Sequence, residues 1–125
     1  MSTSCDCGTA PKLIYACSGA ADVGGVSDLV ARKLTKEGVG KMSCLVGIGG
    51  RVSGLMKSAE AAKMLLAIDG CPLNCAKKCL EEAGFSNVTH LQLGDVGLKK
   101  GETEINDFHI EMAAVKARAM LEAVG

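Results

Sequence analysis

Four short apolar runs, each followed by a segment with a helical pattern, constrain the fold of this chain more than any other feature. The runs are KLIYAC (12–17), KMSCLVGI (41–48), MLLAID (64–69) and NVTHLQL (87–93). Apolar runs of this length that alternate with helices are typical of strands in a parallel sheet that is covered on both faces. The sequence therefore predicts an α/β protein, a doubly wound three-layer α/β/α sandwich with about four parallel strands.

The segments between and after these runs predict helices. Ser27 is a candidate N-cap for a helix over DLVARKLTKE (28–37), and Gly38 then follows as the C′ residue. Further helices are expected over 53–63, over Pro72–Glu82 with Gly84 at C′, and from Asn106 or Asp107 nearly to the C-terminus.

Length and composition limit the organisation of the chain. A chain of 125 residues fits one domain, which we assign to residues 12–125. Residues 1–11 are polar and lack the apolar core of a signal peptide, so we expect a flexible leader that carries Cys5 and Cys7. No run approaches the ~20 apolar residues of a membrane span. These features predict a cytoplasmic protein without a membrane partner.

Charge and aromatic content argue against nucleic acid as a partner. The formal net charge is zero, no Lys/Arg block stands out, and aromatic residues make up only 2% of the chain. Nucleic-acid binding commonly needs a basic surface, and single strands also need aromatic rings for stacking. We therefore predict no nucleic-acid partner.

The seven cysteines carry most of the functional information. Thiols stay reduced in the cytoplasm, and an odd number cannot be fully paired. Metal binding or thiol chemistry is therefore a better interpretation than a disulfide framework.

Several cysteines fall near the carboxyl ends of predicted strands, the edge where ligands bind in open parallel sheets. Cys17 ends the first strand, Cys44 lies late in the second, and Cys71 follows the third. Cys75 joins them from the next helix. Four thiolates in tetrahedral array hold zinc, and iron or an iron–sulfur cluster is the alternative. Buried free cysteine is also a common small hydrophobe, which is the competing interpretation of Cys17 and Cys44.

The even spacing of Cys71, Cys75 and Cys79 is expected to hide a difference. On one helix, Cys71 and Cys75 differ by about 40° and share a face. Cys71 would be the N-cap. Cys79 lies near the apolar stripe and about 12 Å along the axis from Cys71, too far for one metal ion to bind both. We predict two ligands and one packing residue.

The stretch IDGCPLNCAKKCLEEAG resembles the signature of the DGC-domain family, named for Asp69-Gly70-Cys71. YACSGAADVGGVSDLVARKL (15–34) and CLVGIGG (44–50) support the match, which covers roughly residues 12–84. The family is described as zinc-binding through four potential chelating cysteines. The resemblance implies that these are Cys17, Cys44, Cys71 and Cys75.

Other functions remain open at this point, and so does the question whether the protein is an enzyme. Cys71 could be the reactive thiolate of a redox enzyme or sulfur carrier. The glycine-rich loops CSGAADVGG and GIGGRVSG, with Arg51, could hold a small anionic ligand. Asp69 is expected to cap a helix, and His90 to be a satisfied histidine on its strand rather than a ligand.

Overall fold

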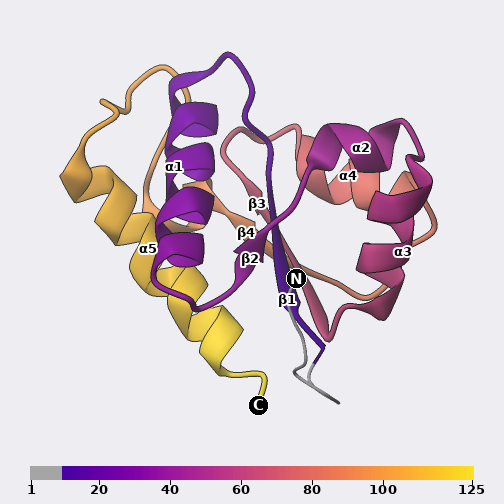
Figure 1. The fold of residues 1–125 in the computed structure, drawn as a ribbon. Coiled ribbons are helices and arrows are strands. Elements are labelled where there is room, and N and C mark those ends of the chain that lie inside the picture. The colour runs from indigo at the N-terminus through magenta and orange to yellow at the C-terminus, as the bar shows by residue number, and fades with distance from the viewer. Residues whose placement is uncertain (1–9) are drawn as a thin grey trace.

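A four-stranded parallel sheet lies between two layers of helices in the computed structural model, which describes residues 10–125 (Figure 1). The strands are β1 (Lys12–Ala16), β2 (Lys41–Met42), β3 (Met64–Asp69) and β4 (Val88–Gln92), in the order β2-β1-β3-β4. The chain builds outward from β1 to β2 and then, on the other side of β1, to β3 and β4. The predicted doubly wound α/β architecture is confirmed, with its switch point between β1 and β3.

This reversal explains which helices cover which face. Parallel strands are joined by right-handed crossovers, so connections that run in opposite directions along the sheet lie on opposite faces. One face carries α1 (Asp22–Lys36) and α5 (Asp107–Glu122), and the other carries α2 (Leu45–Gly49), α3 (Ser53–Ala61) and α4 (Cys75–Glu82) (Figure 1). The short 3₁₀ helix η1 (Leu93–Val96) follows β4 directly.

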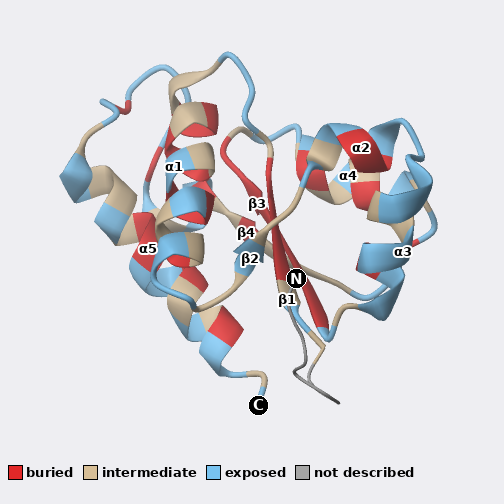
Figure 2. Ribbon diagram, in the orientation of Figure 1, coloured by how far each residue is buried: buried red, intermediate tan, exposed pale blue. Residues whose placement is uncertain are grey.

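Two apolar cores hold the layers together. Ile14 and Ala16 of β1 face the core under α1 and α5, whereas Leu13 and Tyr15 face the core under α2, α3 and α4. Every residue of β3 is buried, as expected for a central strand covered on both sides (Figure 2). β1 and β3, which flank the switch point, are therefore buried almost throughout, and loops follow their carboxyl ends.

Several boundaries agree with the sequence prediction. The third strand occupies the predicted residues 64–69, and the last helix begins at Asp107 after an Asn106 N-cap. The helix predicted over 53–63 ends two residues earlier, and β4 is one residue shorter at each end than predicted. Residues 1–9 of the predicted leader, with Cys5 and Cys7, lie outside the described residues.

The prediction for the start of the first helix was wrong. The helix begins at Asp22, and Ser27 lies buried inside it, where its hydroxyl donates to the Val23 carbonyl at 2.9 Å. Gly24 and Gly25 lie inside this helix although glycine has a low helix propensity, because tertiary packing overrides it. A Cβ on Gly24 would lie 2.8 Å from the backbone nitrogen of Gly19, so only glycine allows this close approach.

The prediction of one long strand over 41–48 was also wrong. The strand ends at Met42, and the apolar residues that follow form α2. Cys44 is the N-cap of this helix, and its Sγ accepts the Gly47 N–H at 3.3 Å. A short apolar run does not distinguish a buried strand from a buried helix. Here the Cys44 cap favours the helix.

The predicted start of α4 at Pro72 needs a third correction. The helix begins at Cys75 after Asn74, which is the N-cap and has a left-handed backbone with φ 56°. Cys71 and Pro72 lie in the turn before it. Cys71 is therefore not the helix N-cap, and the argument that Cys71 and Cys75 share a helical face does not hold.

Candidate functional site

Four of the cysteines follow the carboxyl ends of three neighbouring parallel strands. Cys17 is the first residue after β1, whereas Cys44 and Cys71 are the second residues after β2 and β3. Cys75 opens α4. All four are free thiols; Cys44 and Cys75 are exposed, and Cys17 and Cys71 are half-buried. Cys17, Cys44 and Cys71 therefore lie at the carboxyl edge of the sheet.

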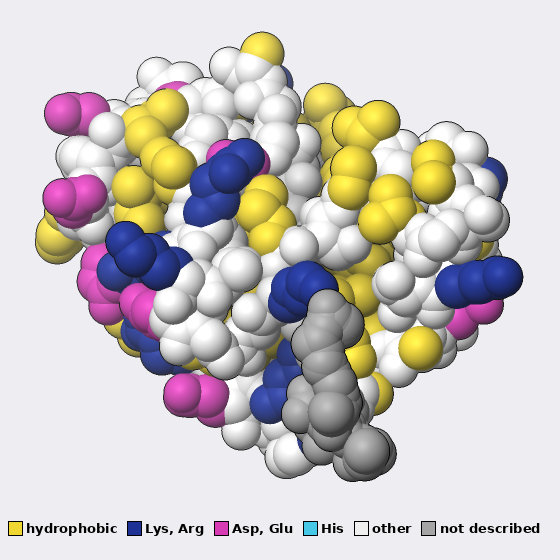
Figure 3. Space-filling view, viewed as in Figure 1, with side chains coloured by type: hydrophobic (Ala, Val, Ile, Leu, Met, Phe, Trp, Pro, Cys, Tyr) yellow, Lys and Arg dark blue, Asp and Glu magenta, His cyan; other side chains and the backbone are white. Residues whose placement is uncertain are grey.

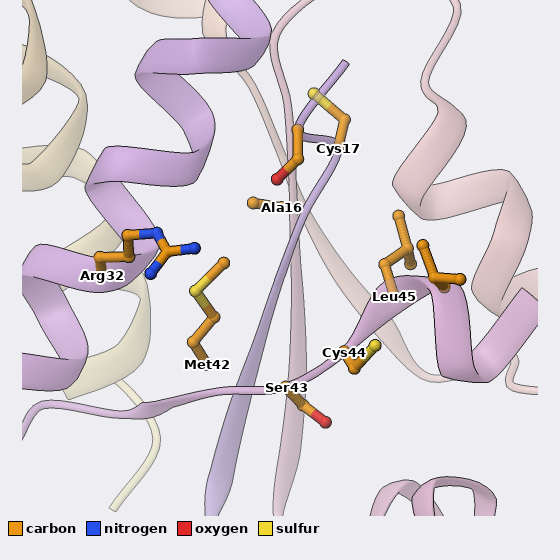
Figure 4. A pocket seen from close by; sticks show the side chains of 9 residues that line it. Ala16, Cys17, Arg32, Met42, Ser43, Cys44 and Leu45 are labelled. Carbon is orange, nitrogen blue, oxygen red and sulfur yellow. The ribbon is translucent and has the colours of Figure 1, made fainter. Parts of the chain in front are cut away.

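Cys17 and Cys44 line one cavity of about 450 Å³ (Figure 4). The Cys17 backbone N–H donates to the Ile68 carbonyl at 3.1 Å, and its Sγ accepts the Gly70 N–H at 3.3 Å. The Cys44 Sγ accepts its N–H from Gly47. Backbone N–H groups that donate to a thiolate ligand offset part of its negative charge.

Gly70 joins this cavity to the next pair of cysteines. It lies between β3 and Cys71, and its N–H is the one that reaches Cys17. A Cβ on Gly70 would lie 2.4 Å from the backbone carbonyl carbon of Val23 in α1. The central residue of the Asp-Gly-Cys stretch must therefore be glycine, because the loop after β3 packs directly on the backbone of α1.

The segment with Cys71 and Cys75 is fixed by Asp69. This carboxylate is 1% exposed, and it accepts the N–H groups of Ala76 at 2.7 Å and Lys77 at 3.0 Å. It caps α4 as predicted, but from five residues before the helix N-cap. His90 of β4 contacts the same carboxylate, with 2.9 Å between Nε2 and Oδ2. His90 is thus a satisfied histidine on its strand.

Gln92, two residues further along β4, holds the other end of the turn. Its Nε2 donates to the carbonyl of Cys71 and to Oδ1 of Asn74, both at 2.8 Å. Residues two apart on a strand lie on the same face, so His90 and Gln92 form one support along β4. Sequence reasoning missed this support, and the i, i+2 spacing of two polar residues on a strand was the one local signal for it.

Cys79 occupies a different environment from the other four cysteines. It lies half-buried between α2 and α4, where its Sγ is 3.7 Å from the Leu45 carbonyl oxygen. Burial raises the pKa of this thiol, which the charge of Arg51 opposes and nearby Cys75 reinforces. A half-buried thiol with a raised pKa, packed against the core, favours the interpretation that Cys79 packs rather than binds.

Arg51 joins the ends of two helices. Its guanidinium donates to the carbonyls of Ile48 at 2.9 Å, Gly49 at 3.1 Å and Glu82 at 2.9 Å. The C-terminal ends of α2 and α4 are thereby tied together. Because its N–H groups meet backbone carbonyls, Arg51 is poorly placed to hold the small anionic ligand considered above.

No group of three or more His, Cys, Asp or Glu side chains is arranged to hold a metal ion anywhere in residues 10–125. Two parts of the set are nevertheless linked. Cys17 and Cys44 line the same cavity, and Cys17 contacts the residue next to Cys71. No helix of the described chain is long and apolar enough to cross a membrane.

A doubly wound α/β domain with cysteines at the carboxyl edge of its sheet is the class that this geometry defines. The chain belongs to the DGC domain family, whose model matches residues 13–119. Among its relatives is the Anaerobic and virulence modulator AnvM of Pseudomonas aeruginosa (strain PAO1), which is 41% identical over 88 residues. That alignment covers 70% of this chain and 67% of AnvM. No solved structure matches the chain.

Proposed function

We propose that this chain is a zinc-binding protein with a structural or metal-handling role, and that its ligands are Cys17, Cys44, Cys71 and Cys75. The observation that carries the proposal is the position of these four thiols after the ends of β1, β2 and β3, on both sides of the switch point. Ligands of doubly wound folds bind at this crevice.

The chemistry of the donors supports this choice. Four thiolates around zinc form a closed tetrahedral site with a net charge of about −2. The Gly70 and Gly47 N–H groups already point at two of the sulfurs and would offset part of that charge. The same thiolates would also suit an iron–sulfur cluster, so the metal itself must be measured.

The proposal requires a rearrangement when metal binds. Since no three donors among the described residues are arranged around one point, the Cys44 side of the edge and the Cys71–Cys75 segment must approach each other. Metal binding that is coupled to ordering of its ligands is common, because the ligands also lose their protons at that step. A bound zinc would then lock the ends of three strands together.

Metal analysis after anaerobic purification tests the proposal. We expect about one zinc per chain for the wild type, as a closed tetrahedral site requires. Cys71→Ser should lose most of it. Cys79→Ser is the matched control on the same helix as Cys75 and should retain it, because Cys79 packs between α2 and α4. A folded wild-type protein that neither retains nor takes up zinc would overturn the proposal.

The alternative, a thiol enzyme or sulfur carrier based on Cys71, makes a different prediction for alkylation. In the metal-free protein, exposed Cys44 and Cys75 should react before half-buried Cys71. With zinc bound, all four should be protected while Cys79 stays slow. Fast and selective labelling of Cys71 without metal loss would favour the thiol enzyme.

We further propose a reducing compartment, the cytoplasm, as the setting, because the thiolates must stay reduced to bind metal. The name of the relative AnvM describes an anaerobic and virulence modulator. Carried over to this chain, it suggests a modulatory protein whose metal occupancy depends on reduced thiols. Zinc retained without oxygen and released by peroxide would support that role, whereas zinc that resists peroxide would count against it.

A further inference from the structure

The cavity beside Cys17 and Cys44 has the composition of a small-molecule site. Its volume of about 450 Å³ falls in the range of ligand pockets. Apolar atoms form most of the wall, and Ser18 and Ser43 are among the polar residues that line it. The apolar residues are Ala16, Met42, Leu45 and Val46. Of the described residues that line it, Arg32 is the one charged side chain.

Arg32 is oriented by a short chain of hydrogen bonds. Its Nε donates to Oδ2 of Asp28 at 2.7 Å, and Oδ1 of Asp28 accepts the Ser18 hydroxyl at 2.7 Å. Ser18 follows Cys17 and has a left-handed backbone with φ 46°. The residue next to the Cys17 thiol and the guanidinium on α1 are thus held by the same carboxylate.

This arrangement leaves the outer edge of the guanidinium available to a ligand. Asp28 takes the Nε–H, and within residues 10–125 the two Nη groups donate no hydrogen bond. Figure 4 shows the guanidinium extending from α1 toward Ala16 and Met42, on the cavity side of β1. A planar guanidinium with free N–H groups matches a carboxylate or phosphate.

We propose that this cavity binds a small organic anion with an apolar chain. The acid group pairs with the Nη groups of Arg32, and the chain lies against Met42, Leu45 and Val46, next to the two thiols. Figure 3 shows hydrophobic side chains gathered over α2, where Val46 is 83% exposed. The cation is Arg32, whereas the glycine-rich loop pattern had pointed to Arg51. The proposal uses only side chains of this chain and does not depend on bound metal.

An NMR titration of the reduced, metal-free full-length chain tests this site. Butyrate should shift the backbone amides of Cys17, Ser18, Arg32 and Cys44, with a dissociation constant on the order of 1–10 mM. Butanol should shift them far less at equal concentration. Monobutyl phosphate separates the two acid classes, because tighter binding than butyrate would identify a phosphate monoester and weaker binding a carboxylate.

Substitutions at Arg32 and at the exposed rim of the cavity test the site without a large risk to folding. Arg32 is 65% exposed, so Arg32→Met should fold and weaken butyrate binding about tenfold or more. Lys57→Met, at an exposed cation of α3 that does not line the cavity, is the matched control and should bind like the wild type. Val46→Glu at the exposed rim should also weaken binding, because it adds a like charge. Amide shifts that are absent at about 100 mM butyrate, or unchanged binding by Arg32→Met, would overturn the proposal.

The zinc measurement and the butyrate titration test the two proposals independently. A protein that binds zinc but no anion refutes this inference and leaves the metal proposal standing. A protein that binds butyrate through Arg32 but no zinc does the reverse.

Discussion

Cys71 and Cys75 lie on a segment that is held from two sides, whereas Cys17 and Cys44 face an open cavity. The segment of the first pair is anchored by the buried Asp69 carboxylate and by Gln92 of β4. At the second pair, each sulfur accepts a single backbone N–H. One half of the edge is therefore preorganised, and the other has room for a ligand.

This difference suggests a division of work along the edge. Cysteine ligands that are already held in place lose little entropy when metal binds. An open cavity gives a metal ion or small molecule access to the site. We expect the Cys71–Cys75 segment to define the position of a metal and the Cys17–Cys44 side to close on it. Substitutions that loosen the Cys71–Cys75 segment should lower folding stability. Substitutions at the cavity beside Cys17 and Cys44 should change binding.

The largest effect is expected at Gly70, which belongs to both halves. Gly70→Ala places a Cβ 2.4 Å from the Val23 backbone, which cannot move aside as a side chain could. We expect a loss of about 3 kcal/mol or more in the free energy of unfolding, measured by urea denaturation.

Gly54→Ala is the matched control for Gly70→Ala. Gly54 lies in α3, and a Cβ there meets no atom within 4 Å. Alanine should stabilise this helix by about 0.5–1 kcal/mol. Equal stability of the two variants would show that the close packing of Gly70 on α1 does not matter.

Asp69 should give the next largest effect, and it tests whether the Cys71–Cys75 segment is preorganised. Asp69→Ala leaves the buried Ala76 N–H, the half-buried Lys77 N–H and His90 without their acceptor, at a cost of about 2–4 kcal/mol. Asp69→Asn keeps one acceptor oxygen and should cost less. The control is Asp95→Ala at an exposed carboxylate, with a change within about 0.5 kcal/mol. A small effect of Asp69→Ala in urea denaturation would mean that the Cys71–Cys75 segment is stable without the Asp69 hydrogen bonds.

Local sequence patterns predicted the parts of this molecule that depend on local contacts. The third strand and the last helix have long patterns and clear caps, and their positions were predicted well. The start of α4 was not, because the turn before it is held by Gln92, 18 residues from Asn74 in the sequence. No short window contains both partners of such a contact.

The candidate site divides in the same way. The position of Cys17, Cys44 and Cys71 just after three strands followed from the alternation of strands and helices, since parallel strands end at one edge. The choice of cation did not, because Arg51 and Arg32 look alike in sequence. Only the fold turns Arg51 toward the backbone carbonyls of two helix ends and places Arg32 at the cavity.

Gln92→Ala should lower the free energy of unfolding by less, and its effect should be confined to the Cys71–Cys75 segment. It removes the bonds to Cys71 and Asn74, and also the Gln92 contact with the Gly94 N–H, at a total cost of about 1–2 kcal/mol. Timed alkylation with mass spectrometry should show faster labelling of Cys71 and unchanged labelling of Cys44. Asn87→Ala, an exposed amide before β4, serves as control. Equal acceleration at both cysteines would mean that the two halves are not held separately.

Asp28 should give the smallest effect, and it is visible only as a dependence on pH. Burial works to raise the pKa of Asp28, but the hydrogen bonds from Arg32 and Ser18 outweigh it and leave the pKa lowered. A lowered pKa means that the folded state prefers the ionised carboxyl. The stabilisation is therefore fully present above the unfolded pKa of about 4 and is lost as the pH falls through the lower folded value.

Wild type should be slightly more stable than Asp28→Asn at pH 7, and urea denaturation should show the stabilities of the two proteins converging in acid. A stability difference that stays constant below pH ~4 would mean that the Asp28 charge does not hold the cavity wall in place.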